Sequence, residues 1–136
     1  MVDGQELIRT FLQQSPFALL AGLELRDIGP DRAKLELPFD EKVTTAGQVV
    51  HGGAISTLID TAATAASWAA EFQNMPKRWG TASLTVDFVR GAEGRDLVAE
   101  AKVIRRGKSL CHCTVEARDD DGIVATGIVV YALSWI

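Results

Sequence analysis

The chain has 136 residues, of which 47% are hydrophobic and 24% are charged, and its formal net charge is -4. This length predicts a single domain spanning residues 1–136, and the acidic balance argues against non-specific binding to nucleic acid. No run of residues is apolar enough throughout to span a bilayer, so no membrane partner is expected. The N-terminus carries acidic residues early and lacks a basic segment, which predicts a cytoplasmic protein without a signal peptide.

Residues 3–14 carry apolar side chains at helical spacing and predict a short amphipathic helix, with Asp3 as its N-cap. Residues 23–37 alternate between apolar and polar types on either side of Gly29-Pro30-Asp31, which predicts a β-hairpin. A loop over residues 39–50 leads to the next element.

A long helix is predicted from Gly52 to about Phe72, because this stretch is rich in alanine and has no proline or internal glycine. Its residues are apolar around most of the circumference, so we expect it to be buried. One carboxylate, Asp60, is set into it, with Ser56 and Thr64 one turn away on either side. A carboxylate in such a place is costly unless it is hydrogen-bonded or used in chemistry.

His51, Gly52 and Gly53 open this helix. A helix N-terminus presents free backbone N–H groups, and glycine allows a ligand to approach them closely. An oxygen site at the start of the helix and a carboxylate two turns further on suit attack on a polarised carbonyl group. The alternative is structural: the glycines only make a turn, and Asp60 only satisfies a neighbouring backbone group.

Beyond a break at residues 75–80, turn sequences separate four more stretches with strand character. These stretches are residues 81–89, 96–104, 109–118 and 123–133. Consecutive hairpins are antiparallel. We therefore predict an α+β fold in which a six-stranded antiparallel sheet wraps around one long central helix.

Two cysteines, Cys111 and Cys113, alternate within the third of these strands and should share one face, with His112 on the other. A zinc site needs about four ligands, and the sequence has no second cluster of such residues. We interpret both cysteines as buried structural thiols and predict no metal site.

This order of elements, together with His51-Gly52-Gly53 and Asp60, resembles the hotdog-fold acyl-CoA thioesterases, in particular the phenylacetate-degradation type. The resemblance extends from about residue 16 to residue 133. It implies a hotdog fold and hydrolysis of an acyl- or aryl-CoA thioester to the free acid and coenzyme A. No cofactor is implied, because coenzyme A is part of the substrate.

The resemblance also implies roles for individual residues. The Gly53 backbone N–H would polarise the thioester carbonyl, beside Gly52, and Asp60 would act as nucleophile or general base. Thr64 matches a water-binding hydroxyl, and Thr81 matches a Ser or Thr near the thioester. His51 would shape the floor of the pocket, although a purely structural role in bonding the loop is the alternative.

Many members of this family carry an Asn or Gln six residues before the histidine, contributed across a dimer interface. Here that position is Thr45, and Gln48 is the nearest amide. The family also implies a homotetramer, a dimer of dimers, with the site at the dimer interface, and basic residues that bind the phosphates of coenzyme A. The basic candidates, each with solvated surface charge as the alternative, are Arg90, Arg105, Arg106 and Lys108.

Two other functions remain open. A dehydratase of the same fold would need a catalytic histidine in a different motif, and His112 lies too far along the chain. A non-catalytic acyl-CoA-binding or regulatory domain is the second. Asp60 and its hydroxyl neighbours argue against it, because a mere binding site would favour an apolar residue there.

Overall fold

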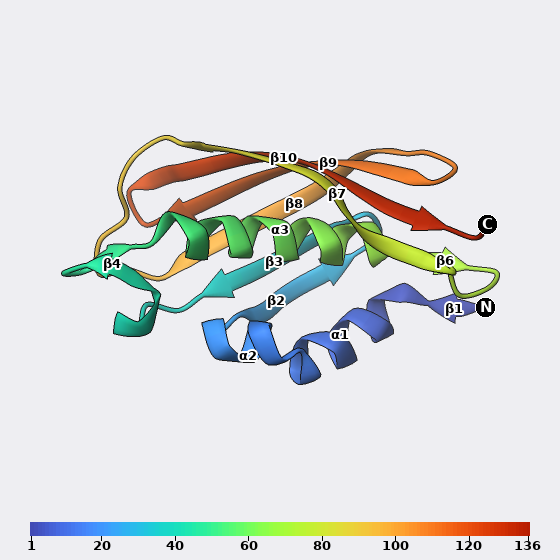
Figure 1. Cartoon of the computed structure of the whole chain (residues 1–136), viewed down its shortest axis with the longest axis horizontal. Helices are drawn as coiled ribbons and strands as arrows, with labels where there is room; N and C mark the ends of the chain where they lie inside the picture. The colour runs from blue at the N-terminus through green and yellow to red at the C-terminus, as the bar shows by residue number, and fades with distance from the viewer.

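The computed structural model describes residues 1–136, and its two main layers are a curved sheet and the long helix that the sheet encloses (Figure 1). The helices are α1 (Gly4–Gln14), α2 (Pro16–Ala21), the short 3-10 helix η1 (Glu41–Val43) and α3 (Gly52–Trp68). The main sheet contains β2 (Glu24–Gly29), β3 (Arg32–Leu37), β7 (Arg78–Phe88), β8 (Leu97–Arg106), β9 (Leu110–Asp119) and β10 (Gly122–Ser134). Two short ladders pair β1 (Val2–Asp3) with β6 (Glu71–Phe72) and β4 (Thr44–Ala46) with β5 (Val49–Val50).

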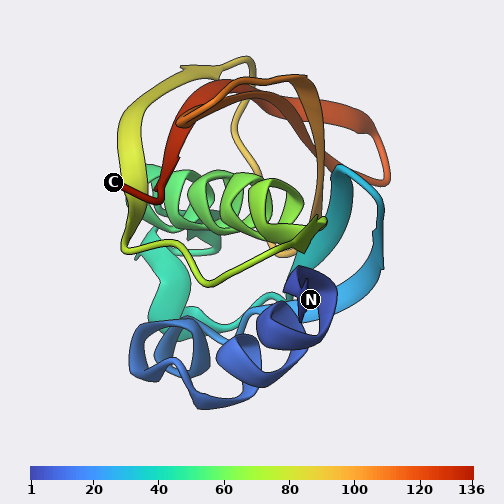
Figure 2. The ribbon, with the colours of Figure 1, turned by 90° about the vertical axis from the view of Figure 1, so that its right-hand side faces the viewer.

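The six main strands are antiparallel and lie in the order β2-β3-β8-β9-β10-β7. Figure 2 shows α3 end-on inside the curve of this sheet, with α1 and α2 across the open side. The prediction of a six-stranded antiparallel sheet wrapped around one long helix, the hotdog arrangement, is therefore confirmed. None of the helices is long and apolar enough to cross a membrane.

The strand after the long helix does not form a hairpin with the strand that follows it. β7 pairs with β10, and in that ladder Thr81 is opposite Tyr131. The prediction of four consecutive hairpin strands is wrong at this point, because local sequence does not determine a non-local partner. The strand also starts earlier than predicted, at Arg78, since the ladder continues to Ser134.

The long helix ends at Trp68, four residues before the predicted end at Phe72. The N-terminal segment lies against this end: the Gly4 N–H donates to the Ala70 carbonyl at 2.9 Å. A side chain on Gly4 would place its Cβ only 1.7 Å from the Trp68 carbonyl oxygen, so the two backbones touch. Asp3 accepts bonds from two N–H groups of α1, which confirms it as the N-cap.

The apolar side of α3 forms the centre of the core. Leu58 and Ile59 are fully buried, and a Cβ on Gly127 of β10 would lie 2.5 Å from Ile59, so helix and sheet pack closely there. Cys111 and Cys113 are buried in the same core, as predicted. The sheet covers only this side of the helix and leaves the opposite side for the site described next.

Candidate active site

The uncovered side of α3 carries a stripe of small and polar residues. Four of them are spaced so that they share one helical face: Gly53, Thr57, Asp60 and Thr64. All four are at least partly exposed in the single chain. The expectation that Asp60 is buried is therefore wrong, because the sheet packs only against the larger apolar residues of the helix.

The Asp60 carboxylate is held by a residue from the edge strand. The Thr81 hydroxyl donates to Asp60 Oδ1 at 2.6 Å. Neither Ser56 nor Thr64 bonds to this carboxylate, although helical spacing placed both beside it. Asp60 Oδ2 has no protein partner, so one carboxylate oxygen is oriented and the other is free to act on a water molecule or a carbonyl carbon.

The start of α3 is capped by its own histidine. The Gly53 N–H donates to His51 Nδ1 at 2.7 Å, while the His51 N–H donates to the Val43 carbonyl at 2.8 Å. His51 Nδ1 is thus an acceptor, which places the ring proton on Nε2. The N–H predicted to polarise a carbonyl is therefore engaged within the loop, whereas the neighbouring Gly52 N–H has no protein partner.

A pocket of about 360 Å³ opens by Thr81, the residue that bonds Asp60, and lies along the C-terminal half of α3. Thr64 and Thr81 lie at its polar side, and most of the remaining lining is apolar. That apolar and aromatic lining comprises Leu7, Ile8, Phe11, Trp68, Met75, Trp79 and Tyr131. We call this space the acyl pocket. Its walls suit an aryl group or an alkyl chain.

A second hollow, of about 460 Å³, lies by the N-terminal half of the same stripe. His51, Gly53 and Thr57 line it from the side of α3, and Phe17 and Leu20 of α2 line the other side. The stripe of α3 thus connects two hollows, with the Asp60 carboxylate between them.

Two of the predicted coenzyme A contacts are engaged in holding the fold together. Arg90 forms a bidentate pair with the nearly inaccessible carboxylate of Asp119, which also accepts the Asp121 N–H. The Arg90 pair holds the pKa of Asp119 at about 2, well below its usual 3.8. Arg106 binds Asp31 at 2.7 Å and the Ser67 carbonyl at 2.9 Å, at the C-terminal end of α3.

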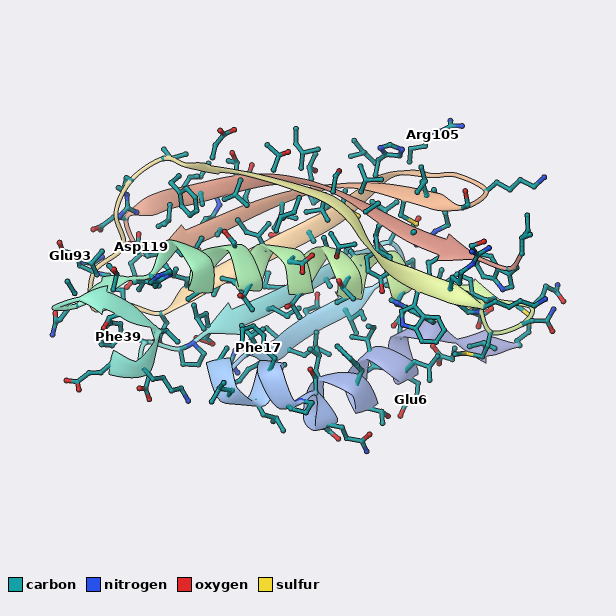
Figure 3. The ribbon with its side chains drawn as sticks, in the orientation of Figure 1. Glu6, Phe17, Phe39, Glu93, Arg105 and Asp119 are labelled. Carbon is teal, nitrogen blue, oxygen red and sulfur yellow. The ribbon has the colours of Figure 1, made fainter.

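The other two cations, Arg105 and Lys108, are exposed and take part in no ion pair. Figure 3 places Arg105 at the opposite end of the molecule from Asp119, and hence from Arg90. The four basic residues therefore do not gather at one pocket mouth in a single chain. Arg90 and Arg106 therefore match neither the predicted phosphate contacts nor the alternative of solvated surface charge, because both are bonded within the fold, whereas Arg105 and Lys108 remain available.

Thr45 and Gln48 lie in the β4–β5 hairpin beyond the N-terminal end of α3, and both are exposed. The Gly94 N–H donates to the Gln48 carbonyl at 3.0 Å, which ties this hairpin to the β7–β8 connection. Neither side chain contacts Asp60. The chain thus brings together Asp60, Thr64 and Thr81 but leaves the predicted amide position apart from them.

The residues that line the acyl pocket from α1 and β10 were not among the predicted site residues. Tyr131 is 3% exposed, and its hydroxyl accepts a bond from Trp68 Nε1 at 2.9 Å. The alternation Val129, Tyr131, Leu133 shows that this tyrosine faces inward. That signal was present in the sequence, whereas the contribution of α1 depends on how the helix docks.

Comparison with known proteins agrees with this fold. Residues 47–126 match the Thioesterase superfamily, and the chain belongs to this family. A candidate esterase of Halobacterium salinarum is 32% identical over 111 residues, covering 79% of this chain and 73% of that protein.

A second relative and one solved structure have more specific names. The medium/long-chain acyl-CoA thioesterase YigI of Salmonella typhimurium is 26% identical over 137 residues, covering 89% of this chain and 87% of that protein. The structure of the E. coli PaaI protein from the phenylacetic acid degradation operon superposes with a TM-score of 0.82 at 20% identity, covering 96% of this chain and 93% of the other. At that identity the second likeness is one of fold.

Proposed function

We propose that this protein hydrolyses acyl-CoA thioesters to the free acid and coenzyme A. The observation that carries the proposal is the Asp60 carboxylate, which accepts a bond at 2.6 Å from Thr81, a residue that itself lines an apolar pocket. Membership of the thioesterase superfamily and the name of the Salmonella relative support the same reaction.

In this mechanism Asp60 Oδ2 activates a water molecule or attacks the thioester carbon itself. The Thr81 hydroxyl keeps Oδ1 in place, which leaves Oδ2 for the water molecule or the thioester carbon. A positioned carboxylate base typically contributes about 100- to 10,000-fold to the rate. The acyl group would extend into the acyl pocket, and coenzyme A would leave toward the second hollow at the start of α3.

The backbone donor that polarises the thioester carbonyl is, in this proposal, the Gly52 N–H rather than that of Gly53. The Gly52 N–H is unpaired at the positive end of α3, while Gly53 donates to His51. His51 then has a positioning role: its cap fixes the backbone of the first helical turn. If the Gly53 N–H also donates to the thioester oxygen, its bond to His51 Nδ1 has to break first.

The active form is proposed to be a homotetramer, a dimer of dimers in which the first contact joins two β7 edges. β7 has 11 residues and a neighbour on one side only, and Asp87 is the one charge between Arg78 and its end. The opposite edge, β2, is instead shielded by ion-paired charges on Glu24 and Asp27. A long, weakly charged edge strand has unpaired N–H and C=O groups that can pair with the edge strand of a second chain.

A β7–β7 dimer would cover the open face of α3 and bring a second β4–β5 hairpin near it. Thr45 and Gln48 would then serve the partner's site rather than their own.

Arg105 and Lys108 are the proposed contacts to the phosphates of coenzyme A, because both are exposed and neither takes part in an ion pair. Two unpaired thiols fit a reducing compartment, and we propose the cytoplasm.

Thiol release from a panel of acyl-CoAs, read with a colour reagent, tests the proposed reaction. The panel should span acetyl-, octanoyl-, palmitoyl- and phenylacetyl-CoA, because the pocket walls accept both aromatic and alkyl groups. We expect hydrolysis of at least one member that depends on Asp60. Tight binding of acyl-CoA without hydrolysis of any member would instead identify a non-catalytic acyl-CoA-binding domain.

A further inference from the structure

The imidazole of His51 engages a backbone donor that the proposed mechanism leaves unused. Its Nδ1 accepts the Gly53 N–H at 2.7 Å, and a Cβ on Gly53 would lie only 2.9 Å from the same atom, so the ring lies directly against this backbone. Both residues line the second hollow, at the start of α3. The bond uses the lone pair of Nδ1, which is available only while that nitrogen carries no proton.

The first turn of α3 is held without the help of the imidazole. The His51 N–H donates to the Val43 carbonyl at 2.8 Å. The His51 carbonyl accepts the N–H groups of Ala54 and Ile55 at 2.9 and 3.1 Å. The side chain of His51 is exposed beside a hollow of about 460 Å³. The ring can therefore turn away from Gly53 while the backbone of the turn keeps its place.

Few charged groups surround the ring. Lys42 of η1 is the one charged residue that lines the hollow, and α2, β4 and the first turn of α3 contribute none. Asp40 and Glu41, which precede Lys42, do not line it, and Asp60 lies about two turns further along α3. No carboxylate holds a protonated His51 in the cap, whereas Lys42 and the positive end of the helix repel it.

We propose that the His51 cap is a proton-operated switch on the backbone donors of the thioester site. With a neutral ring the cap is closed, and the Gly52 N–H is the free donor. A proton on Nδ1 turns the acceptor into a donor, so the ring leaves Gly53, whose N–H becomes available beside that of Gly52. The inference rests on the proposed thioester hydrolysis and adds its regulation by pH, since histidine ordinarily changes charge between about pH 5 and 8.

Amide spectra of the protein without substrate test the opening of the cap. Between about pH 8 and pH 5.5 we expect the Gly53 amide resonance to shift in step with the protonation of the His51 ring. Its hydrogen exchange, corrected for the intrinsic effect of pH, should become roughly two- to tenfold faster on the acid side, as for the loss of one hydrogen bond. A Gly53 amide that does not follow the titration of His51 overturns the inference, and so does a ring that stays neutral throughout.

His51→Asn separates the ring from other titrating groups, because asparagine caps helices but does not titrate. We expect its Gly53 amide to stay protected and unshifted across the same range. His112→Asn is the matched control: it removes the other histidine of the chain, which lies between the buried Cys111 and Cys113 on the outer face of β9, and should leave the Gly53 response intact. An equal response of Gly53 in His51→Asn, or its loss in His112→Asn, overturns the inference.

Kinetics separate the switch from the proposed reaction. The ratio of kcat/KM for the wild type to that for His51→Asn, measured with one hydrolysed acyl-CoA, cancels the pH dependence of the other groups. We expect this ratio to rise about tenfold from pH 8 to pH 5.5, because a second N–H reaches the thioester oxygen. A constant ratio overturns the inference and leaves the hydrolase intact. A Gly53 amide that follows His51 in a protein without thioesterase activity supports the switch and overturns only the proposed reaction.

Discussion

Thr81 and Asp60 come from different elements, the edge strand β7 and the central helix α3, and their side chains meet at 2.6 Å. This bond fixes the carboxylate on the one face of the helix that the sheet leaves open. Since the bond uses only Oδ1, the second carboxylate oxygen is left for a substrate or a water molecule. The chemistry of the site therefore depends on how β7 is placed beside α3.

Asp60→Asn keeps the shape of the side chain and can still accept the Thr81 bond, but it removes the charge and the basicity. We expect a fall in kcat on the order of a hundredfold or more, with little change in thermal stability, if Asp60 acts in the reaction. Steady-state kinetics and a thermal melt measure the two effects. A variant that melts earlier but turns over at a near-normal rate would show that Asp60 is only structural.

Gly52→Pro deletes a single backbone N–H at the first position of α3, where proline is tolerated. The preceding residue, His51, has φ -63° and ψ 133°, which is compatible with a following proline. We expect kcat to fall about 100- to 1,000-fold, as for loss of one oxyanion donor, with the fold retained. Gly53→Pro is the comparison, because it removes the N–H that His51 caps. A larger loss of kcat in Gly53→Pro than in His51→Ala, which removes the same cap but keeps the Gly53 N–H, would return the polarising role to Gly53.

Arg105→Ala and Lys108→Ala should raise KM for acyl-CoA with little change in kcat, the pattern of lost ground-state binding. A several-fold effect is expected for each, and it should shrink in high salt because exposed charges are screened. The same kinetics with a thioester that lacks the nucleotide part serve as the control. If KM for acyl-CoA is unchanged in both variants and in the double variant, these residues are ordinary surface charge.

The ion pair between Arg90 and Asp119 should make the free energy of unfolding depend on pH in the acidic range. The pKa of Asp119 is lowered from 3.8 to about 2 in the folded protein, so its contribution is complete above about pH 4 and is lost as the pH falls toward 2. Denaturant titrations at pH 7 and pH 2.5 should show this loss in the wild type. Asp119→Asn should cost about 1–2 kcal/mol at pH 7, since Arg90 is partly exposed, and should show a smaller loss on acidification.

The free edge of β7 should carry the first dimer contact. Leu84 is 39% exposed on this strand, and Leu84→Lys would place a charge on the proposed interface. We expect light scattering to show a tetramer for the wild type and a lower mass for Leu84→Lys. Glu24→Gln at the opposite edge, β2, is the control and should leave the mass unchanged. A wild-type monomer of about 15 kDa at micromolar concentration would contradict the assembly.

The sequence by itself determined the elements and one half of the site. Alternation and turn residues predicted the strands, and the alanine-rich stretch with a single acid predicted α3 and Asp60, because both signals are local and periodic. His51-Gly52-Gly53 likewise marked the start of the helix. The apolar periodicity of residues 3–14 predicted α1, since an amphipathic pattern reflects the face that a helix buries.

Only the tertiary structure decided which elements meet. The pairing of β7 with β10 brings Thr81 to Asp60 and Tyr131 to the same pocket, and no local pattern specifies a partner 50 residues away. Docking of the N-terminal segment against Ala70 ends α3 early and adds α1 to the pocket wall. The sequence could say which side chains face inward, but contacts between distant segments depend on how the sheet curls around the helix and on which side it leaves open.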